Sequence, residues 1–166
     1  MSKAKSRISW PKLVASILLC QIVGNLGTIF TLPALTNWYV SLTKPFFNPP
    51  NWLFGPVWLI LYTLMGISLY LIWNKLPSIK EPIKNKALTA FFIQLSLNLL
   101  WSLLFFGLHS PLYGFIDIIF LWSAIVFTIH EFSKISKTAS NLLIPYIIWV
   151  SFAAILNLSI LILNFR

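Results

Sequence analysis

Four long stretches of this chain carry no Asp, Glu, Lys or Arg, and these stretches constrain the fold more than any other feature of the sequence. They cover residues 13–43, 45–74, 87–116 and 138–165. About 20 apolar residues, at a rise of about 1.5 Å each, cross a hydrocarbon core about 30 Å thick. Each stretch is therefore long enough for a helix that crosses a bilayer. The composition agrees, because 58% of the 166 residues are hydrophobic and only 9% are charged.

The third stretch is interrupted by His109, Ser110 and Pro111, and a proline after a polar pair indicates a break between two helices. The sequence therefore predicts an all-α fold: a single domain, residues 1–166, that forms an integral membrane bundle of five transmembrane helices. The predicted helices cover residues 13–30, 53–73, 87–108, 112–130 and 142–163.

The basic residues indicate how the bundle is oriented. Five spans place the two termini on opposite sides, and cytoplasmic loops carry an excess of Lys and Arg. With the N-terminus inside, two basic residues lie outside, Lys44 and Arg166, and ten lie inside: Lys3, Lys5, Arg7, Lys12, Lys75, Lys80, Lys84, Lys86, Lys134 and Lys137. We therefore predict a multi-pass protein of a bacterial inner membrane, with the N-terminus inside and the C-terminus outside. The short basic clusters fit anionic lipid headgroups, and no nucleic-acid partner is expected.

The connection between the first two helices, residues 33–52, is long and holds aromatic residues and prolines in place of Ser, Gly and charge. Prolines restrict its backbone and aromatic side chains supply apolar surface: Pro33, Pro45, Pro49 and Pro50, with Trp38, Tyr39, Phe46, Phe47 and Trp52. We predict a structured loop that folds back over the bundle, and we call residues 33–52 the lid loop. The alternative is an aromatic belt, in which each Trp anchors a helix end at the headgroups.

Polar residues inside the spans are costly, so their positions are the best guide to a site. They share helix faces with aromatic residues: Gln21, Asn25 and Thr28; Trp58, Tyr62 and Met65; Gln94, Asn98, Trp101 and Phe105; Trp149, Ala153, Asn157 and Ile160. The rise per residue places parts of these faces between the midplane and the outer side, below the lid loop. This predicts an aromatic cavity with a few hydrogen-bonding groups, as in most small-molecule sites. The alternative for each polar residue is a hydrogen bond between helices, without ligand contact.

Asp117 is the one acidic residue well inside a predicted span, about 9 Å below Pro111. An acid at that depth needs a partner, a proton or water. A ligand-binding role and a role as a helix cap or hydrogen-bond anchor both stay open.

Residues for conventional catalysis are missing from the sequence. Cys20, His109 and His130 are scattered along the chain without the spacing of metal ligands, so no metal site is expected. Three acidic residues and no Gly-rich phosphate loop exclude a catalytic triad, a paired-carboxylate site and a P-loop. We therefore expect no required cofactor and no conventional catalytic site.

Several motifs carry a resemblance to a known family. The lid loop and second helix read Trp38-Tyr39-x-x-Leu42-x-Lys44-Pro45-x-x-x-Pro49-Pro50-x-Trp52-x-Phe54-x-Pro56-Val57-Trp58-x-x-Leu61-Tyr62. Further matches are Gln94, Asn98, Trp101-Ser102, Phe105-Phe106-Gly107, Asp117 and Pro145-Tyr146-x-x-Trp149-x-x-Phe152-Ala153-x-x-Leu156-Asn157. Over essentially its whole length, the chain resembles the TspO/MBR family of tryptophan-rich sensory proteins and translocator proteins, also described as peripheral-type benzodiazepine receptors.

The resemblance implies a homodimer of five-helix bundles, with a pocket under the lid loop that binds porphyrins, haem and aromatic drug-like ligands. It matches Trp58 and Trp149 to the tryptophans associated with light-dependent porphyrin degradation in bacterial members. Together with the helix faces described above, it gives the expected ligand-binding residues: Trp38, Tyr39, Phe54, Trp58, Tyr62, Gln94, Asn98, Trp101, Asp117, Trp149, Ala153 and Asn157.

Three functions are consistent with this resemblance. The first is a membrane-embedded binding protein for porphyrin- and haem-type tetrapyrroles, acting as sensor, regulator or carrier in tetrapyrrole and stress homeostasis. The second is an enzyme-like, light-dependent degradation of porphyrin that uses Trp58 and Trp149. The third is a porphyrin transporter, although the sequence contains no inverted repeat. Sterol binding is not expected, because Leu158 stands where the cholesterol motif proposed for animal members has a tyrosine.

Overall fold

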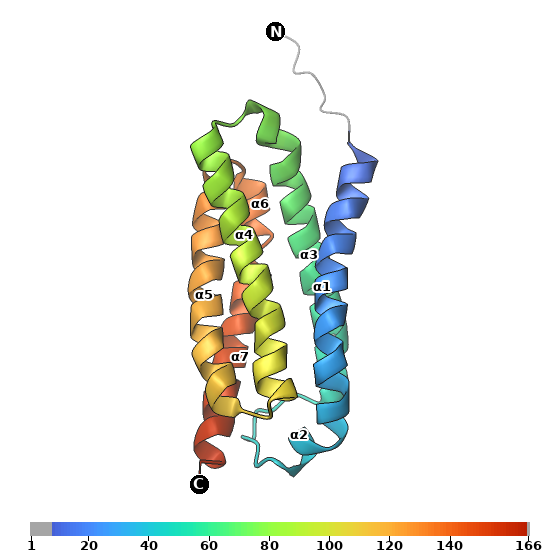
Figure 1. The fold of residues 1–166 in the computed structure, drawn as a ribbon, viewed down its shortest axis with the longest axis vertical. Helices are drawn as coiled ribbons and strands as arrows, with labels where there is room; N and C mark the ends of the chain where they lie inside the picture. The colour runs from blue at the N-terminus through green and yellow to red at the C-terminus, as the bar shows by residue number, and fades with distance from the viewer. Residues whose placement is uncertain (1–7, 166) are drawn as a thin grey trace.

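The computed structural model describes residues 8–165, which form a bundle of long helices joined by short ones (Figure 1). Five helical segments are long and apolar enough to cross a membrane, and the described residues contain no strand, so the predicted all-α bundle of five spans is confirmed. The long helices are α1 (Trp10–Thr36), α3 (Asn51–Lys75), α4 (Glu81–Ser102), α5 (Pro111–Ser133) and α7 (Ile144–Leu163). Lys3, Lys5, Arg7 and Arg166, which entered the orientation prediction, lie outside the described residues.

Short elements connect the spans. They are α2 (Trp38–Ser41), a 3₁₀ turn η1 (Leu76–Ser78), a π-helical turn η2 (Leu103–Gly107) and α6 (Lys137–Asn141). The π turn continues α4, so this span reaches Gly107 and then stops at the predicted break. His109 there has a positive φ of 51°, and the Ser110 side chain accepts a hydrogen bond from the Tyr113 amide at 3.3 Å, which caps α5.

Several helices are longer than the predicted spans. α1 extends the predicted range 13–30 at both ends, and it runs through Pro33 although proline has no N–H to donate to the carbonyl of Ile29. α4 begins at Glu81, six residues before the predicted 87–108, because a charged first turn is stable outside the hydrocarbon and Pro82 suits the first turn of a helix. Hydrophobicity therefore predicted where each long helix lies in the sequence, and not where it ends.

The five long helices do not surround one another evenly. α5 packs between α4 and α7, whereas α1 packs mainly on α3, less on α4, and is the most exposed of the five. The core has two clusters of buried side chains. One fills the half of the bundle away from α2 and includes Met65, Ile72, Phe91, Ile125 and Phe132, and the other lies at the α2 end and includes Tyr39, Phe105 and Phe106.

α1 and α3 approach each other closely in the half of the bundle away from the lid loop. A methyl group built on Gly66 of α3 would lie 2.5 Å from the Cα of Ile17, and one built on Gly24 of α1 would overlap the ring of Tyr62. Nearer the lid loop, a methyl group on Gly55 of α3 would meet nothing within 4 Å. The two helices are therefore in contact at one end and separated at the other.

The lid loop is structured, and its residues 37–50 pack on the ends of α4 and α7. Trp38 stacks on His109 at 4.9 Å between ring centroids, and it contacts the edge of Phe105 at 5.4 Å. The hydroxyl of buried Tyr39 donates to the Asn48 side chain at 2.7 Å.

The lid loop is also fastened to the end of α7 by Asn164. The Asn164 side chain accepts a hydrogen bond from the Thr43 amide at 3.0 Å and donates one to the Thr43 carbonyl at 2.9 Å. These two hydrogen bonds have the same pattern as the pair of bonds that two facing residues exchange in an antiparallel β-sheet.

Candidate functional site

A cavity of about 510 Å³ lies where α1 and α3 separate, in the half of the bundle next to the lid loop. Its volume falls within the usual range of small-molecule sites, about 300–1,000 Å³. α1 and α3 form two sides, and α4, η2 and α7 form the back. The lining residues are Gln21, Gly24, Asn25, Gly27, Thr28, Thr31, Leu32, Leu35, Asn51, Trp52, Phe54, Gly55, Trp58, Leu59, Tyr62, Asn98, Trp101, Ser102, Phe106, Trp149 and Ala153.

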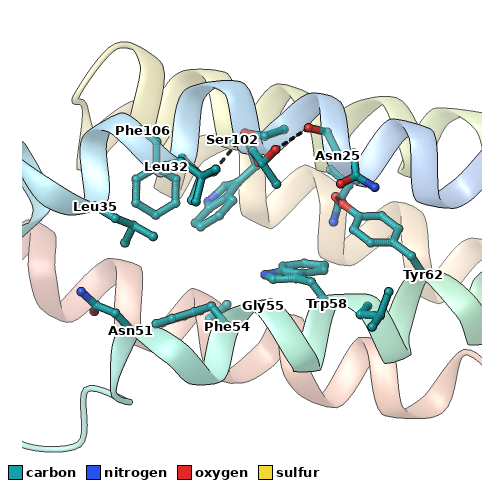
Figure 2. A pocket seen from close by; sticks show the side chains of 18 of the residues that line it. Asn25, Leu32, Leu35, Asn51, Phe54, Gly55, Trp58, Tyr62, Ser102 and Phe106 are labelled. Atoms are coloured by element: carbon teal, nitrogen blue, oxygen red, sulfur yellow. Dashed lines mark hydrogen bonds between the residues drawn. The ribbon is translucent and has the colours of Figure 1, made fainter.

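Aromatic rings form much of the cavity wall. The Trp58 indole stacks on the Tyr62 ring, with centroids 5.4 Å apart and planes 29° apart, and both face the side chains of α1 (Figure 2). Phe54 meets Trp149 edge to face at 6.0 Å. Since such rings offer large flat apolar surface at low entropic cost, this wall suits a flat aromatic ligand.

A chain of three buried side chains closes the inner end of the cavity. The Tyr62 hydroxyl donates to the side-chain oxygen of Asn98, and the Asn98 amide donates to the Tyr146 hydroxyl at 2.9 Å. These residues come from α3, α4 and α7, so the chain ties three spans together. Because Tyr62 is held in this way, the Trp58 ring stacked on it is held as well.

Trp101, at the back of the cavity, is positioned by a residue behind it. Its indole N–H donates to the Asn157 side-chain oxygen at 3.2 Å, and the Asn157 amide donates to the Pro111 carbonyl at 2.8 Å. Asn157 is 2% exposed and does not line the cavity. It therefore acts through Trp101, and it gives the Pro111 carbonyl at the start of α5 a second hydrogen-bond donor, which comes from another helix.

Polar groups of the cavity gather on α1. Gln21 donates to the Leu59 carbonyl and to the Thr63 hydroxyl, both at 3.0 Å, which bridges α1 and α3. Asn25 and Thr28 follow on the same face, nearer the lid loop. The i, i+4, i+7 spacing predicted this polar face, but these three residues were absent from the expected ligand-binding set.

Most of the expected ligand-binding residues meet at the cavity. Those that line it are Phe54, Trp58, Tyr62, Asn98, Trp101, Trp149 and Ala153. The structure places the others elsewhere: Trp38 and Tyr39 lie in the lid loop against Phe105 and Phe106, and Asn157 stands behind Trp101.

Gln94 and Asp117 are buried inside the bundle and do not line the cavity. The Gln94 side-chain nitrogen and oxygen and the Asp117 Oδ2 have no hydrogen-bond partner among the described residues. Gln94 lies one helical turn deeper than Asn98, so helix periodicity alone gave it the same face as Asn98.

The π turn changes which aromatic residues face the cavity. The predicted face of the third span continued from Trp101 to Phe105 at α-helical spacing. A π turn holds more residues than an α turn, so positions after Ser102 are rotated around the helix axis. As a result Phe106 lines the cavity, and Phe105 stacks on Trp101 from outside it, at 5.1 Å and 15°.

The lining of the cavity contains no charged side chain and no histidine. Within residues 8–165, no group of three His, Cys, Asp or Glu side chains is arranged to hold a metal ion. The cavity therefore has the means to bind a ligand by apolar contact, by stacking and by neutral hydrogen bonds.

Comparison with known proteins agrees with the family resemblance of the sequence motifs. The TspO/MBR family model matches residues 16–163. "Tryptophan-rich protein TspO" of Archaeoglobus fulgidus is 50% identical over 92% of this chain and 97% of its own length, and the protein of that name in Chlorobaculum tepidum is 47% identical over 92% and 95%. "Translocator protein" of Ovis aries is 37% identical over 89% of this chain and 87% of its own length.

Proposed function

This chain belongs to the TspO/MBR family and is a multi-pass membrane protein, and we propose that it binds porphyrin- and haem-type tetrapyrroles in the cavity between α1 and α3. In this role it acts as a sensor, regulator or carrier in tetrapyrrole and stress homeostasis. Aromatic drug-like ligands would occupy the same cavity.

The observation that carries this proposal is that aromatic side chains from four separate segments line one cavity. Phe54 and Trp58 come from α3, Trp101 from α4, Phe106 from η2 and Trp149 from α7. A tetrapyrrole is a flat aromatic ring with a large apolar area, and stacking on indole and phenyl rings favours such a ligand beyond the burial of area alone. The neutral amides and hydroxyls of α1 and α4 supply the few polar contacts that orient a ligand.

We also propose that the N-terminus lies inside and the lid loop outside, in a bacterial inner membrane. The described lysines support this orientation, because only Lys44 belongs to the lid loop. The others lie at or next to the ends of α1, α3, α4 and α5 that are farthest from α2 in Figure 1, or at the start of α6: Lys12, Lys75, Lys80, Lys84, Lys86, Lys134 and Lys137. The homodimer implied by the resemblance stays a prediction.

A second candidate function is light-dependent degradation of bound porphyrin. It is favoured by one feature, that Trp58 and Trp149 line the same cavity. Both indoles would then lie against the excited ring system, where they are available for oxidation chemistry in the presence of oxygen.

One experiment separates the two functions. Purified protein in lipid nanodiscs is titrated with protoporphyrin in the dark, and the saturated complex is then illuminated under air. Binding alone predicts saturation at one porphyrin per chain and a bleaching rate no faster than that of porphyrin in empty nanodiscs. Degradation predicts faster bleaching, which slows in Trp58→Phe and Trp149→Phe. Uptake that does not saturate and matches empty nanodiscs contradicts both.

A further inference from the structure

The cavity is open on one side, between the halves of α1 and α3 that lie next to the lid loop. Three lining residues at this side are well exposed: Leu32 on α1 is 63% exposed, and Leu59 and Trp52 on α3 are 60% and 71% exposed. Asn25, Thr28 and Gly55 are exposed between them. We call the gap bordered by these six residues the side opening. In Figure 2, Asn25 and Leu32 of α1 stand across from Gly55 and Trp58 of α3.

Local sequence explains why α1 and α3 separate here. The contacts at Gly66 and Gly24 hold the helices together farther from the lid loop, and the Gln21 bridge to Leu59 and Thr63 is the inner edge of the side opening. Beyond that edge, α3 carries Gly55, which offers no side chain to α1. Each helix also contains a proline in this half, Pro33 or Pro56, which interrupts the backbone hydrogen-bond ladder.

Segment 37–50 of the lid loop is held to one side of the cavity. No residue of segment 37–50 lines the cavity, and that segment is fastened to η2, His109 and α7. The paired hydrogen bonds between Asn164 and Thr43 hold it in place. The fastened segment therefore offers no lining residue to a ligand, whereas exposed residues of the cavity lining border the side opening.

The inner part of the side opening, at Asn25, lies near the middle of α1, at the depth expected for the hydrocarbon core. Asn25 is about 22 Å along α1 from Trp10 and about 16 Å from Thr36. Its amide donates to the Gln21 carbonyl at 2.7 Å, but its side-chain oxygen has no partner among the described residues, and the residue is exposed. An exposed amide facing lipid is unfavourable, so its position at the rim is explained by a ligand that carries polar groups.

We propose that ligands enter this cavity from the lipid bilayer, through the side opening between α1 and α3. This inference rests on the proposed function only in requiring that a ligand binds. It also defines the ligand class: flat amphiphiles that partition into the bilayer and pass edge-on between Leu32 and Gly55. Asn25 and Thr28 then meet the polar groups of the ligand at the rim.

Two variants test the route, with protoporphyrin dimethyl ester as an uncharged, membrane-soluble probe. Gly55→Leu adds a side chain in the side opening, where its Cβ would meet nothing within 4 Å and helix propensity improves. Asn164→Ala removes the fastening of the lid loop and leaves the side opening intact. The probe is added to proteoliposomes at several porphyrin-to-lipid ratios, and association and dissociation rates are read from quenching of tryptophan fluorescence.

We expect Gly55→Leu to slow both association and dissociation by at least about tenfold, and Asn164→Ala to change neither by more than about twofold. The route is wrong if the probe binds saturably but Gly55→Leu associates as fast as wild type. It is also wrong if Asn164→Ala accelerates association, which would indicate entry through the lid loop. In those two cases the proposed function stands. If wild type shows no saturable binding of the probe or of protoporphyrin, both proposals fail.

Discussion

The Trp101 indole at the back of the cavity is held by a hydrogen bond, 3.2 Å long, to a residue that does not touch the cavity, Asn157. The same Asn157 side chain ties α7 to the first residue of α5. One buried amide therefore joins α4, α5 and α7 and sets the orientation of a ring in the cavity wall.

Replacing Asn157 is expected to lower both stability and ligand affinity. In Asn157→Leu the Trp101 N–H loses its partner and the Pro111 carbonyl loses its bond from α7, which costs about 1–3 kcal/mol of the free energy of unfolding. We expect porphyrin affinity to fall about threefold to tenfold, because Trp101 is no longer fixed. Thermal unfolding in detergent and porphyrin titration measure the two effects. Asn85→Leu, at an exposed site on α4, is the matched control, and equal effects of both variants would contradict this role.

The hydrogen-bond chain at the inner end of the cavity gives a second prediction. Tyr62→Phe keeps the ring on which Trp58 stacks but removes the hydroxyl that donates to Asn98. We expect a loss of about 0.6 kcal/mol in the free energy of unfolding, and at most about 1.7 kcal/mol, as for other hydrogen bonds between membrane helices. Porphyrin affinity should fall less than it does in Asn157→Leu. Tyr113→Phe, at an exposed tyrosine on α5, should change neither quantity. If Tyr62→Phe unfolds like wild type, the chain does not stabilise the bundle.

The glycines of α3 provide a matched pair. In Gly66→Ala the new methyl group meets the backbone of Ile17, so α1 must move away from α3. Such overpacking costs about 1–3 kcal/mol. In Gly55→Ala the methyl group enters open space, and the gain in helix propensity is up to about 1 kcal/mol. Thermal unfolding should rank Gly55→Ala at or above wild type and Gly66→Ala below it, and the reverse order would contradict the described contact between α1 and α3.

The absence of charge from the cavity lining predicts how porphyrins are selected. A carboxylate buried without a cation is strongly disfavoured, so carboxylates must stay at the rim. We expect protoporphyrin dimethyl ester to bind within about threefold of the free diacid, and uroporphyrin, with carboxylates on every side of the ring, to bind at least about 30-fold more weakly. Titration of one protein preparation with the three porphyrins checks this order. Tight binding of uroporphyrin would mean that the ligand meets cations, which the cavity does not offer.

The lid loop should lose stability at strongly alkaline pH. Burial raises the pKa of Tyr39 from 10.0 to about 12, against the opposing effect of its hydrogen bond to Asn48. A phenol whose pKa is higher in the folded protein contributes stability that is complete below pH 10 and is lost as the pH rises through about 12. Phenolate absorbance is followed during an alkaline titration of wild type and of Tyr39→Phe. The difference between the two curves should show one tyrosine that ionises at about pH 12. Ionisation of Tyr39 near pH 10 would contradict its burial.

The spans were predictable because a charge inside hydrocarbon is costly, so the charge-free stretches mark them directly. The helix ends were not, since α1 continues through Pro33 and α4 starts in a charged turn. Helix periodicity placed Trp58, Asn98 and Trp149 on faces that meet at the cavity. Periodicity defines a face but not the neighbour opposite it, which is why Gln94 was expected at the ligand and lies buried away from the cavity. Asp117 was singled out by its depth and by the family resemblance, and depth alone does not show which neighbours a side chain meets.

Two other features lay beyond the sequence pattern. The π turn rotates Phe106 into the cavity in place of Phe105, and no residue spacing signals such a turn. Trp38 and Tyr39 were expected among the ligand-binding residues, but contacts of the lid loop with Phe105, Phe106 and Asn164 hold these two rings outside the cavity lining. Those contacts join residues far apart in the chain, so they depend on the folded bundle.

The most direct test of the cavity as the tetrapyrrole site is a dark titration of Trp58→Phe with protoporphyrin, beside wild type and Trp10→Phe. Trp10 lies exposed at the start of α1, far from the cavity, so its replacement controls for the loss of one indole. We predict saturable binding by wild type and Trp10→Phe with equal affinity, and affinity about tenfold lower for Trp58→Phe. Equal affinities for all three proteins would contradict the account.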